Sequence, residues 1–171
     1  RYICLVLKAT CPNAEDVMEY PFTIQVENGV ELGGMIMENT TLYPNVHYIV
    51  SSPLVVPEGI TLTIMPGTVL KFKANSSFNA ANGSLVCVGT PEQPIVFTMA
   101  DLETAYMSSL IFNNNEVEYA IFEDLYINSQ ISGDYGINEA KLRNCVVRNC
   151  IATDYLFDHT TFNNTNVYNN Y

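Results

Sequence analysis

The sequence is poor in basic residues, and this shortage limits the partners that it can bind. Seven Lys and Arg stand against eighteen Asp and Glu, which gives the 171-residue chain a formal net charge of -11. Nucleic acids and anionic membrane surfaces both bind basic patches. We therefore expect neither as a partner, whereas a cation or a cationic partner is compatible with the charge.

Long apolar runs are also missing. No run approaches the roughly 18 residues that a membrane-spanning helix needs, and no signal peptide is visible. We therefore expect no membrane insertion. Because the chain begins with Arg1 rather than Met, we expect a mature or excised segment of a longer protein.

What the sequence does have is a succession of short strands over residues 59–99. Apolar and polar residues alternate around Leu62 and again around Leu70, a period of two that is typical of half-buried strands. Pro66-Gly67 and Gly89-Thr90-Pro91 separate these strands. Both segments favour turns, because glycine tolerates positive φ and proline fixes φ near the turn value.

Similar strands return at nearly constant spacing. Leu85 follows Leu62, and Val146 follows Ile121, after similar intervals of the chain. Such returns are typical of a solenoid, so we expect each pair to be neighbours in successive coils. Residues 155–164 have the same pattern but follow after only about 15 residues. We expect either a truncated last coil or a segment on a different face.

These strands carry a family resemblance. The run EGITLTIMPGTVLKF, then a loop and GSLVCVGTPEQPIVFTM, resembles the opening coils of right-handed parallel β-helix domains in extracellular and cell-surface proteins of the pectin-lyase-like superfamily. The resemblance covers roughly residues 48–171. It implies an all-β fold, with a right-handed parallel β-helix solenoid over residues 38–171, and an extracellular or cell-surface location.

Residues 1–37 do not share the coil pattern. They contain two expected strands, and they form either an N-terminal β cap over the first coil or the remnant of a preceding β-sandwich. The cap is attractive because an uncapped solenoid exposes one end of its core. Residues 31–46 are expected to be a connector.

The chemistry of the turns changes after Pro94, which is the last proline. Asparagine takes over, because it tolerates the left-handed backbone region and its amide can hydrogen-bond to the same side chain one coil above. The asparagines expected at turns are Asn113, Asn114, Asn115, Asn144, Asn149, Asn163, Asn164, Asn166, Asn169 and Asn170.

The strands are expected to bury one face in a narrow core. Each large apolar side chain buried there contributes about 1.5–3 kcal/mol. The residues expected to point inward are Leu62, Ile64, Leu70, Phe72, Leu85, Cys87, Ile95, Phe97, Leu110, Phe112, Ile121 and Val146.

The five cysteines cannot all pair with one another, and no Cys-x-x-Cys zinc motif occurs. Cys4 and Cys11 are the candidate disulfide if the protein is secreted. Cys87 and Cys145 fall in strands, where a thiol behaves as a small hydrophobic group. We expect no cofactor.

Four Asn-x-Ser/Thr sequons begin at Asn39, Asn75, Asn82 and Asn163. In a eukaryotic secreted protein they are candidate glycosylation sites. In a chain rich in Asn and Thr, such triplets also arise by chance.

Catalytic patterns are sparse. Phe157-Asp158-His159 resembles the Asp-His strand motif of pectate lyases, but Leu156 stands where that motif has Trp, and the downstream Arg and Pro signature is absent. No segment of the polygalacturonase kind occurs, and the chain has two histidines. Because a catalytic site needs several convergent groups, we expect no enzyme.

We therefore expect a non-catalytic structural or adhesive segment of a larger extracellular or cell-surface glycoprotein. Its solenoid ends would contact other copies or flanking domains, with end-to-end assembly into a filament. The alternative is a polysaccharide-binding or polysaccharide-lyase-like module. Tyr119, Tyr126 and Tyr155 would then be stacking platforms for glycans, and Asp154 and Asp158 are weak calcium candidates.

Overall fold

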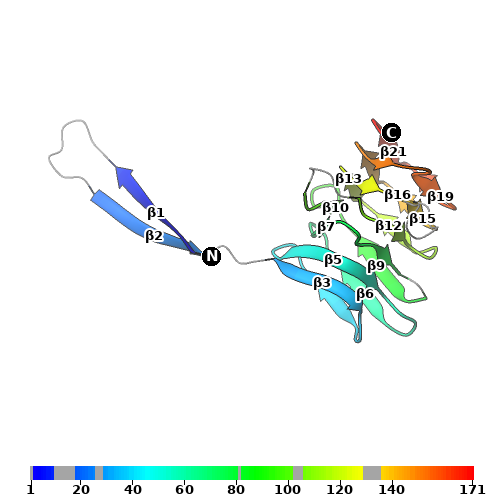
Figure 1. Ribbon diagram of the computed structural model, residues 1–171, viewed down its shortest axis with the longest axis horizontal. Coiled ribbons are helices and arrows are strands. Elements are labelled where there is room, and N and C mark those ends of the chain that lie inside the picture. The colour runs from blue at the N-terminus through cyan, green and yellow to red at the C-terminus, as the bar shows by residue number, and fades with distance from the viewer. Residues whose placement is uncertain (1, 10–17, 26–28, 81, 102–105, 129–135) are drawn as a thin grey trace.

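The computed structural model describes residues 2–9, 18–25, 29–80, 82–101, 106–128 and 136–171, of which the first two segments are described by their backbone. Every element in these ranges is a β-strand. The strands wind into a right-handed parallel β-helix, which confirms the predicted fold. Figure 1 shows the coils following chain order from β3 to β21, and β1 and β2 form a separate two-stranded sheet.

The strands are β1 (Tyr2–Ala9), β2 (Met18–Gln25), β3 (Val30–Met35), β4 (Thr40–Leu42), β5 (His47–Val55), β6 (Thr61–Ile64), β7 (Val69–Phe72), β8 (Phe78–Asn79), β9 (Ser84–Val88), β10 (Ile95–Met99), β11 (Leu110–Ile111), β12 (Glu116–Glu118), β13 (Ala120–Glu123), β14 (Tyr126–Ile127), β15 (Ile137–Asn138), β16 (Lys141–Arg143), β17 (Val146–Arg148), β18 (Ile151–Ala152), β19 (Phe157–Asp158), β20 (Thr161–Asn163) and β21 (Asn166–Tyr168).

The solenoid has walls of stacked parallel strands. The largest sheet has eleven strands in the order β19-β15-β11-β8-β5-β7-β10-β13-β17-β21, with β3 also paired to β5. It makes two walls, because the first half of β5 pairs with β7 and the second half with β8. A six-stranded wall runs β20-β16-β12-β9-β6-β4, and a narrow fourth wall of β14 and β18 is added late in the chain.

The spacing of similar strands predicted the coil neighbours correctly. Leu62 lies opposite Leu85 in the parallel pair of β6 and β9. Ile121 lies opposite Val146 in the parallel pair of β13 and β17. The coils are therefore held together by backbone hydrogen bonds between equivalent strands.

Aromatic rings fill the middle of the core. Phe72, Phe97 and Phe122 stack from coil to coil, with ring centroids 6.4 and 4.8 Å apart. Phe112 meets the edges of Phe97 and Phe122 at 5.9 Å. Stacked and edge-on contacts of this kind add to the free energy gained from burial alone.

Two of the expected inward residues were assigned to the wrong face. Ile121 and Val146 are half-buried, whereas their neighbours Phe122 and Val147 are fully buried. In Ile121-Phe122 and in Val146-Val147 two apolar residues are adjacent, so from the sequence either one could face the core. In the first strand Ala120 is also buried, and Phe122, two residues later, therefore lies on the same inward side. The ten other residues expected to point inward are buried.

The region expected to be a connector contains two strands of the solenoid. β3 pairs in parallel with β5, with a register shift between Leu32 and Gly34, and β4 pairs with β6. The expectation for residues 31–46 was therefore wrong, because short strands interrupted by glycine and methionine have no clear alternation. Coil pairing begins at Val30. The division of the chain at residue 37 stays a prediction.

The last coil is a complete but short one. β19, β20 and β21 each pair with a strand of the preceding coil, as Thr161 does with Lys141. Of the two alternatives, the segment on a different face is confirmed, because residues 161–163 lie in the six-stranded wall whereas residues 146–148, which they resemble, lie in the largest sheet. The likeness arises because this part of the chain repeats every five residues, so steps of three and four such units look alike in the sequence. The period is visible in the backbone, where non-glycine residues with positive φ include Glu139, Asn144, Asn149, His159, Asn164 and Asn169.

Candidate functional site

The Asp-His pair of the lyase-like motif lies in the last coil. Asp158 belongs to β19, and His159 follows it with a φ of 44°. The Nδ1 atom of His159 lies 2.8 Å from Oδ2 of Asp158, and 77% of the His159 side chain is exposed. The pair therefore sits on an open corner of the solenoid, in contact with water, rather than in an enclosed cleft.

The acidic residues of the described chain are spread out. No group of three or more His, Cys, Asp and Glu side chains that could hold a metal ion occurs in the described segments. Asp154 is exposed and Asp158 is half-buried beside His159. The weak calcium candidates Asp154 and Asp158 stay a prediction.

The three candidate stacking tyrosines lie at separate places. Tyr119 lines a shallow hollow of 140 Å³ together with Pro91 and Pro94. Tyr126 belongs to β14, and Tyr155 is exposed just before β19. The sequence did not predict the contact between Tyr126 and Tyr106, whose rings meet edge-on at 6.4 Å.

All four candidate sequon asparagines are exposed. Asn39 is engaged in the fold, because its Oδ1 atom accepts a hydrogen bond of 2.8 Å from the backbone N–H of Thr61. Asn75 has the left-handed φ of 60°. Exposure of these asparagines does not test whether they are glycosylated, so glycosylation stays a prediction.

The cysteines of the solenoid are buried free thiols: Cys87, Cys145 and Cys150. Burial raises the pKa of the Cys150 thiol to about 11, and burial likewise raises the pKa values of Cys87 and Cys145. These thiols are core groups, as expected for Cys87 and Cys145. Cys4 is a residue of β1, and Cys11 lies outside the described residues, so the candidate disulfide stays a prediction.

Ion pairs connect neighbouring coils on the outside. Arg143 forms ion pairs with Glu116, at 2.6 Å, and with Glu118. Arg148 binds Glu123 at 2.6 Å, and hydrogen bonds to Tyr168 and Glu123 raise the pKa of Arg148. Each of these cations is paired with a carboxylate of the adjacent coil. They are therefore a structural ladder rather than a site for an acidic ligand.

The last described coil has one strand edge that no other described strand covers. β19, β20 and β21 each have a partner strand on one side among the described strands. Phe157 and Phe162 meet edge-on at 5.0 Å, and Phe162 is 46% exposed. Residues 155–171 contain one acidic side chain, Asp158, and no Lys or Arg. This end is therefore almost uncharged, in a chain of net charge -11.

Polar side chains tie this last coil to the coil below it. Thr165 donates to the carbonyl of Leu142 at 3.1 Å and accepts from the N–H of Cys145 at 3.4 Å. Asn170 makes the same two bonds, to Val147 and from Cys150, at 3.1 and 2.9 Å. Half-buried polar groups satisfied in this way stabilise the terminal coil. The sequence indicated Asn170 only as a turn former, and it did not single out Thr165.

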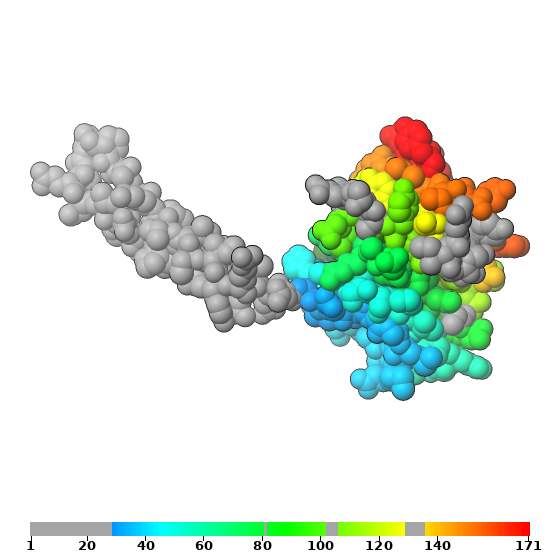
Figure 2. Space-filling model, in the orientation of Figure 1, coloured from blue at the N-terminus to red at the C-terminus, as the bar shows by residue number. Residues whose placement is uncertain are grey.

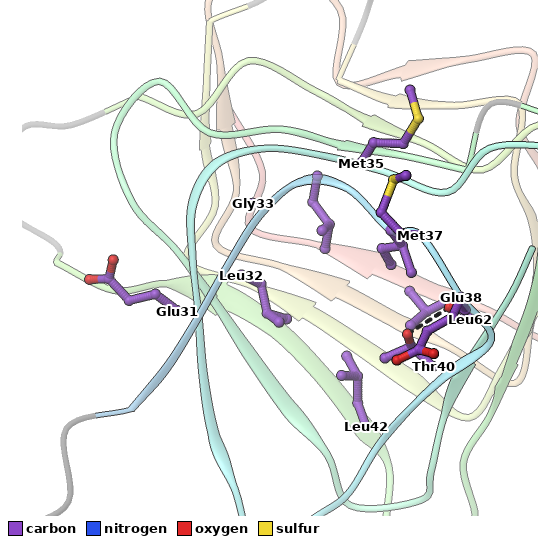
Figure 3. A pocket seen from close by; sticks show the side chains of 11 residues that line it. Glu31, Leu32, Gly33, Met35, Met37, Glu38, Thr40, Leu42 and Leu62 are labelled. Atoms are coloured by element: carbon purple, nitrogen blue, oxygen red, sulfur yellow. Dashed lines mark hydrogen bonds between the residues drawn. The ribbon is translucent and has the colours of Figure 1, made fainter.

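The N-terminal end has a hollow of about 350 Å³. Leu42, Leu54 and Leu62 form its buried part, and Met35 and Met37 stand at its rim, 59% and 80% exposed. Figure 3 shows the side chains of Met37, Leu42 and Leu62 around this space, with Glu31 directed away from it. Figure 2 shows that this end (blue) and the C-terminus (red) lie at opposite ends of the coil stack. β3 has a register shift between Leu32 and Gly34, and beside it the first coil leaves its core partly uncovered.

The stacked parallel walls and the continuous apolar core define a parallel β-helix. Residues 34–109 match the family model described as a pectate-lyase like beta helix domain. Residues 34–109 are therefore similar to pectate-lyase-like β-helix domains, and the resemblance noted in the sequence is confirmed. No curated protein and no solved structure matches the chain.

The described segments contain no helix that is long and apolar enough to cross a membrane.

Proposed function

We propose that this β-helix is a non-catalytic structural or adhesive segment of an extracellular or cell-surface protein, and that its C-terminal end associates with other copies or with flanking domains. The open edge of β19, β20 and β21 carries this proposal. Unpaired backbone groups at a sheet edge pair readily with another strand unless Lys, Pro or a covering element prevents it. Residues 155–171 contain neither Lys nor Pro.

The distribution of charge also supports association through the C-terminal end. Of the eighteen acidic residues of the chain, residues 155–171 hold only Asp158, which is paired with His159. Two copies that meet elsewhere would bring many like charges together, whereas two C-terminal ends bring few. Repulsion is therefore weakest where the strand edge is open.

The association is tested by sedimentation of the full chain over a range of concentrations. Phe162→Asp, which places a charge on the terminal surface, should abolish association. Val86→Asp, at an exposed position on the six-stranded wall, should leave it unchanged. A chain that stays monomeric at high concentration would contradict the association, as would equal effects of the two substitutions.

The exposed Asp158–His159 pair supports the absence of catalysis, because proton transfer to a bound substrate requires several positioned groups around the reacting atoms. The chain should show no turnover of polygalacturonate or common glycans in the presence of calcium. Turnover that is lost in His159→Ala would overturn this part of the proposal.

A second candidate function is the binding of a polysaccharide. The contact of Tyr106 with Tyr126 favours it, because two neighbouring aromatic rings can stack on sugar rings. Binding of a glycan that is weakened by Tyr126→Ala and unchanged by Tyr155→Ala would support this alternative and locate it on the narrow wall of β14 and β18.

A further inference from the structure

The last coil carries core-facing side chains that remain partly exposed. Opposed residues of paired strands lie on the same side of a sheet. Three such pairs join the last coil to the coil before it: Ile137–Phe157, Leu142–Phe162 and Val147–Val167. The first residue of each pair is buried, so the second points towards the core as well. Phe162 and Val167 are nevertheless 46% and 45% exposed.

Backbone groups are uncovered at the same end. A strand inside a sheet directs its N–H and C=O groups to a neighbour on each side. Among the described strands, β19, β20 and β21 have one neighbour each, namely β15, β16 and β17. Each of these three last strands also carries one of the three core-facing side chains. A strand edge next to exposed apolar side chains is suited to pair with another strand edge.

The N-terminal end of the solenoid is a poor partner for this surface. Its strand β3 has a register shift between Leu32 and Gly34, and an irregular edge pairs less readily with another strand. The exposed Glu38 lines the hollow at this end. Residues 155–171 contain no Lys or Arg, so stacking them on the hollow would cover a carboxylate without supplying a cation. Head-to-tail stacking is therefore disfavoured.

A second C-terminal end fits this surface better. It brings the same apolar side chains, and its one acidic residue, Asp158, lies beside His159. A two-fold interface uses the same patch on both copies, and two-fold dimers are the commonest soluble homo-oligomers. Two right-handed coils that meet end to end about such an axis run in opposite directions. Their edge strands are therefore antiparallel.

We propose that two copies associate through their last coils about a two-fold axis, with β20 of each copy paired antiparallel to β20 of the other. The last strands rise along the coil in the order β19, β20, β21, and two such ramps fit together when the middle strands face each other. The Phe162 side chains then lie at the centre of the interface. This inference rests on the proposed association through the C-terminal end and names its partner, and it gives a closed pair instead of the filament expected from the sequence.

Disulfide trapping in the full chain tests the arrangement. In antiparallel β20 strands centred on Phe162, Thr161 of one copy lies opposite Asn163 of the other, with Cα atoms about 4.5–5.5 Å apart, which a disulfide can span. Thr161→Cys and Asn163→Cys, both at exposed positions, are mixed in equal amounts and mildly oxidised, and the linked peptides are identified by mass spectrometry. Mixed disulfides should exceed the sum of like disulfides several-fold, because like positions are about 7–8 Å apart.

A second mixture is the matched control. Thr41→Cys changes β4, which ends the six-stranded wall on the side opposite to β20. Head-to-tail stacking that continues this wall would bring β20 beside β4 of the next copy, so Thr161→Cys mixed with Thr41→Cys should stay unlinked. The unaltered chain, oxidised in parallel, measures the background from the native cysteines.

The outcomes separate this inference from the proposed function. Linkage of Thr161→Cys to Thr41→Cys, or sedimenting species that grow beyond the dimer, would overturn the two-fold pair and leave association through the ends standing. Association without the mixed disulfide of Thr161→Cys and Asn163→Cys would overturn the pair as well. A chain that stays monomeric at high concentration contradicts both the pair and the proposed association.

Discussion

The early coils, residues 40–112, and the late coils, residues 116–171, differ in their buried side chains and in their corners. In the early coils the buried side chains are mainly large, such as Leu70, Phe72 and Phe97. In the late coils they include Ala140, Cys145 and Cys150. Coil length does not separate the two regions. The step from Phe78 to its partner Leu110 is longer than that from Lys141 to Thr161, but the step from Leu62 to Leu85 is shorter than that from Ile121 to Val146.

The corners of the two regions differ. Early corners use proline and glycine in loops of unequal length, whereas late corners place one left-handed residue every five residues. The late core still contains large buried side chains such as Phe122 and Leu142 beside the small ones. The comparison teaches that the chain can change how it turns at the corners while the core inside keeps large apolar side chains.

The largest effect is expected from a charge placed in the core of the early coils. Leu85→Asp should prevent cooperative folding, because a buried, unpaired carboxylate costs far more than the stability of a domain can offset. Circular dichroism and thermal unfolding give the measurement. Val86→Asp changes the exposed neighbour in the same strand and should leave the fold intact. Similar losses in both variants would show that the two sides of β9 are not distinct.

The second test asks which of the adjacent residues Ile121 and Phe122 faces the core, at the point where the early coils meet the late ones. Phe122→Ala should lower the free energy of unfolding by about 3–5 kcal/mol, because it leaves a cavity among the stacked rings. Ile121→Ala, one residue earlier on the half-buried side, should cost clearly less. Urea unfolding of both variants provides the comparison, and a larger loss for Ile121→Ala would reverse the assigned faces.

The left-handed corners of the late coils give a smaller effect. Asn149 has a φ of 55° and is exposed. Asn149→Ala should lower the free energy of unfolding by about 1 kcal/mol, because a Cβ-bearing residue other than Asn or Asp is strained in this region. Asn149→Gly should be tolerated, since glycine adopts positive φ without strain. If both variants unfold at the same urea concentration, the corner does not depend on backbone conformation.

The smallest expected effect concerns the ion pair that links β3 to the early coils. Lys73 donates to Glu31 at 2.8 Å, and this hydrogen bond and the charge of Lys73 lower the pKa of the Glu31 carboxyl below 4.5. A depressed carboxyl pKa stabilises the fold above the unfolded-state pKa, and this contribution is lost as the pH falls through the folded-state pKa. Because Glu31 is exposed, the change should be slight.

Urea midpoints of the unaltered chain and of Glu31→Gln, measured from about pH 6 down to about pH 3, test the pair. The difference between the two proteins should shrink as the pH falls below 4.5. A difference that grows on acidification would have the wrong sign for this pair.

The sequence by itself determined the class of fold and the order of the coils. Turn residues at short intervals and apolar alternation specify strands locally, and the returns from Leu62 to Leu85 and from Ile121 to Val146 specify which strands meet. These properties depend on residues that lie close together in the sequence or recur at a regular interval. They can therefore be predicted before the chain is folded.

The tertiary structure alone decided the rest. Ile121 and Phe122 suit either face equally well, so only packing against Phe97 selected Phe122 for the core. The five-residue repeat of the last coils fits a step of three or of four units, and closure of the coil selected four. The bonds of Thr165 and Asn170 to the coil below, the contact of Tyr106 with Tyr126, and the hollow under Met35 and Met37 all join segments distant in the sequence. Such contacts arise only when the coils stack, because the pattern within each strand does not record what lies opposite it.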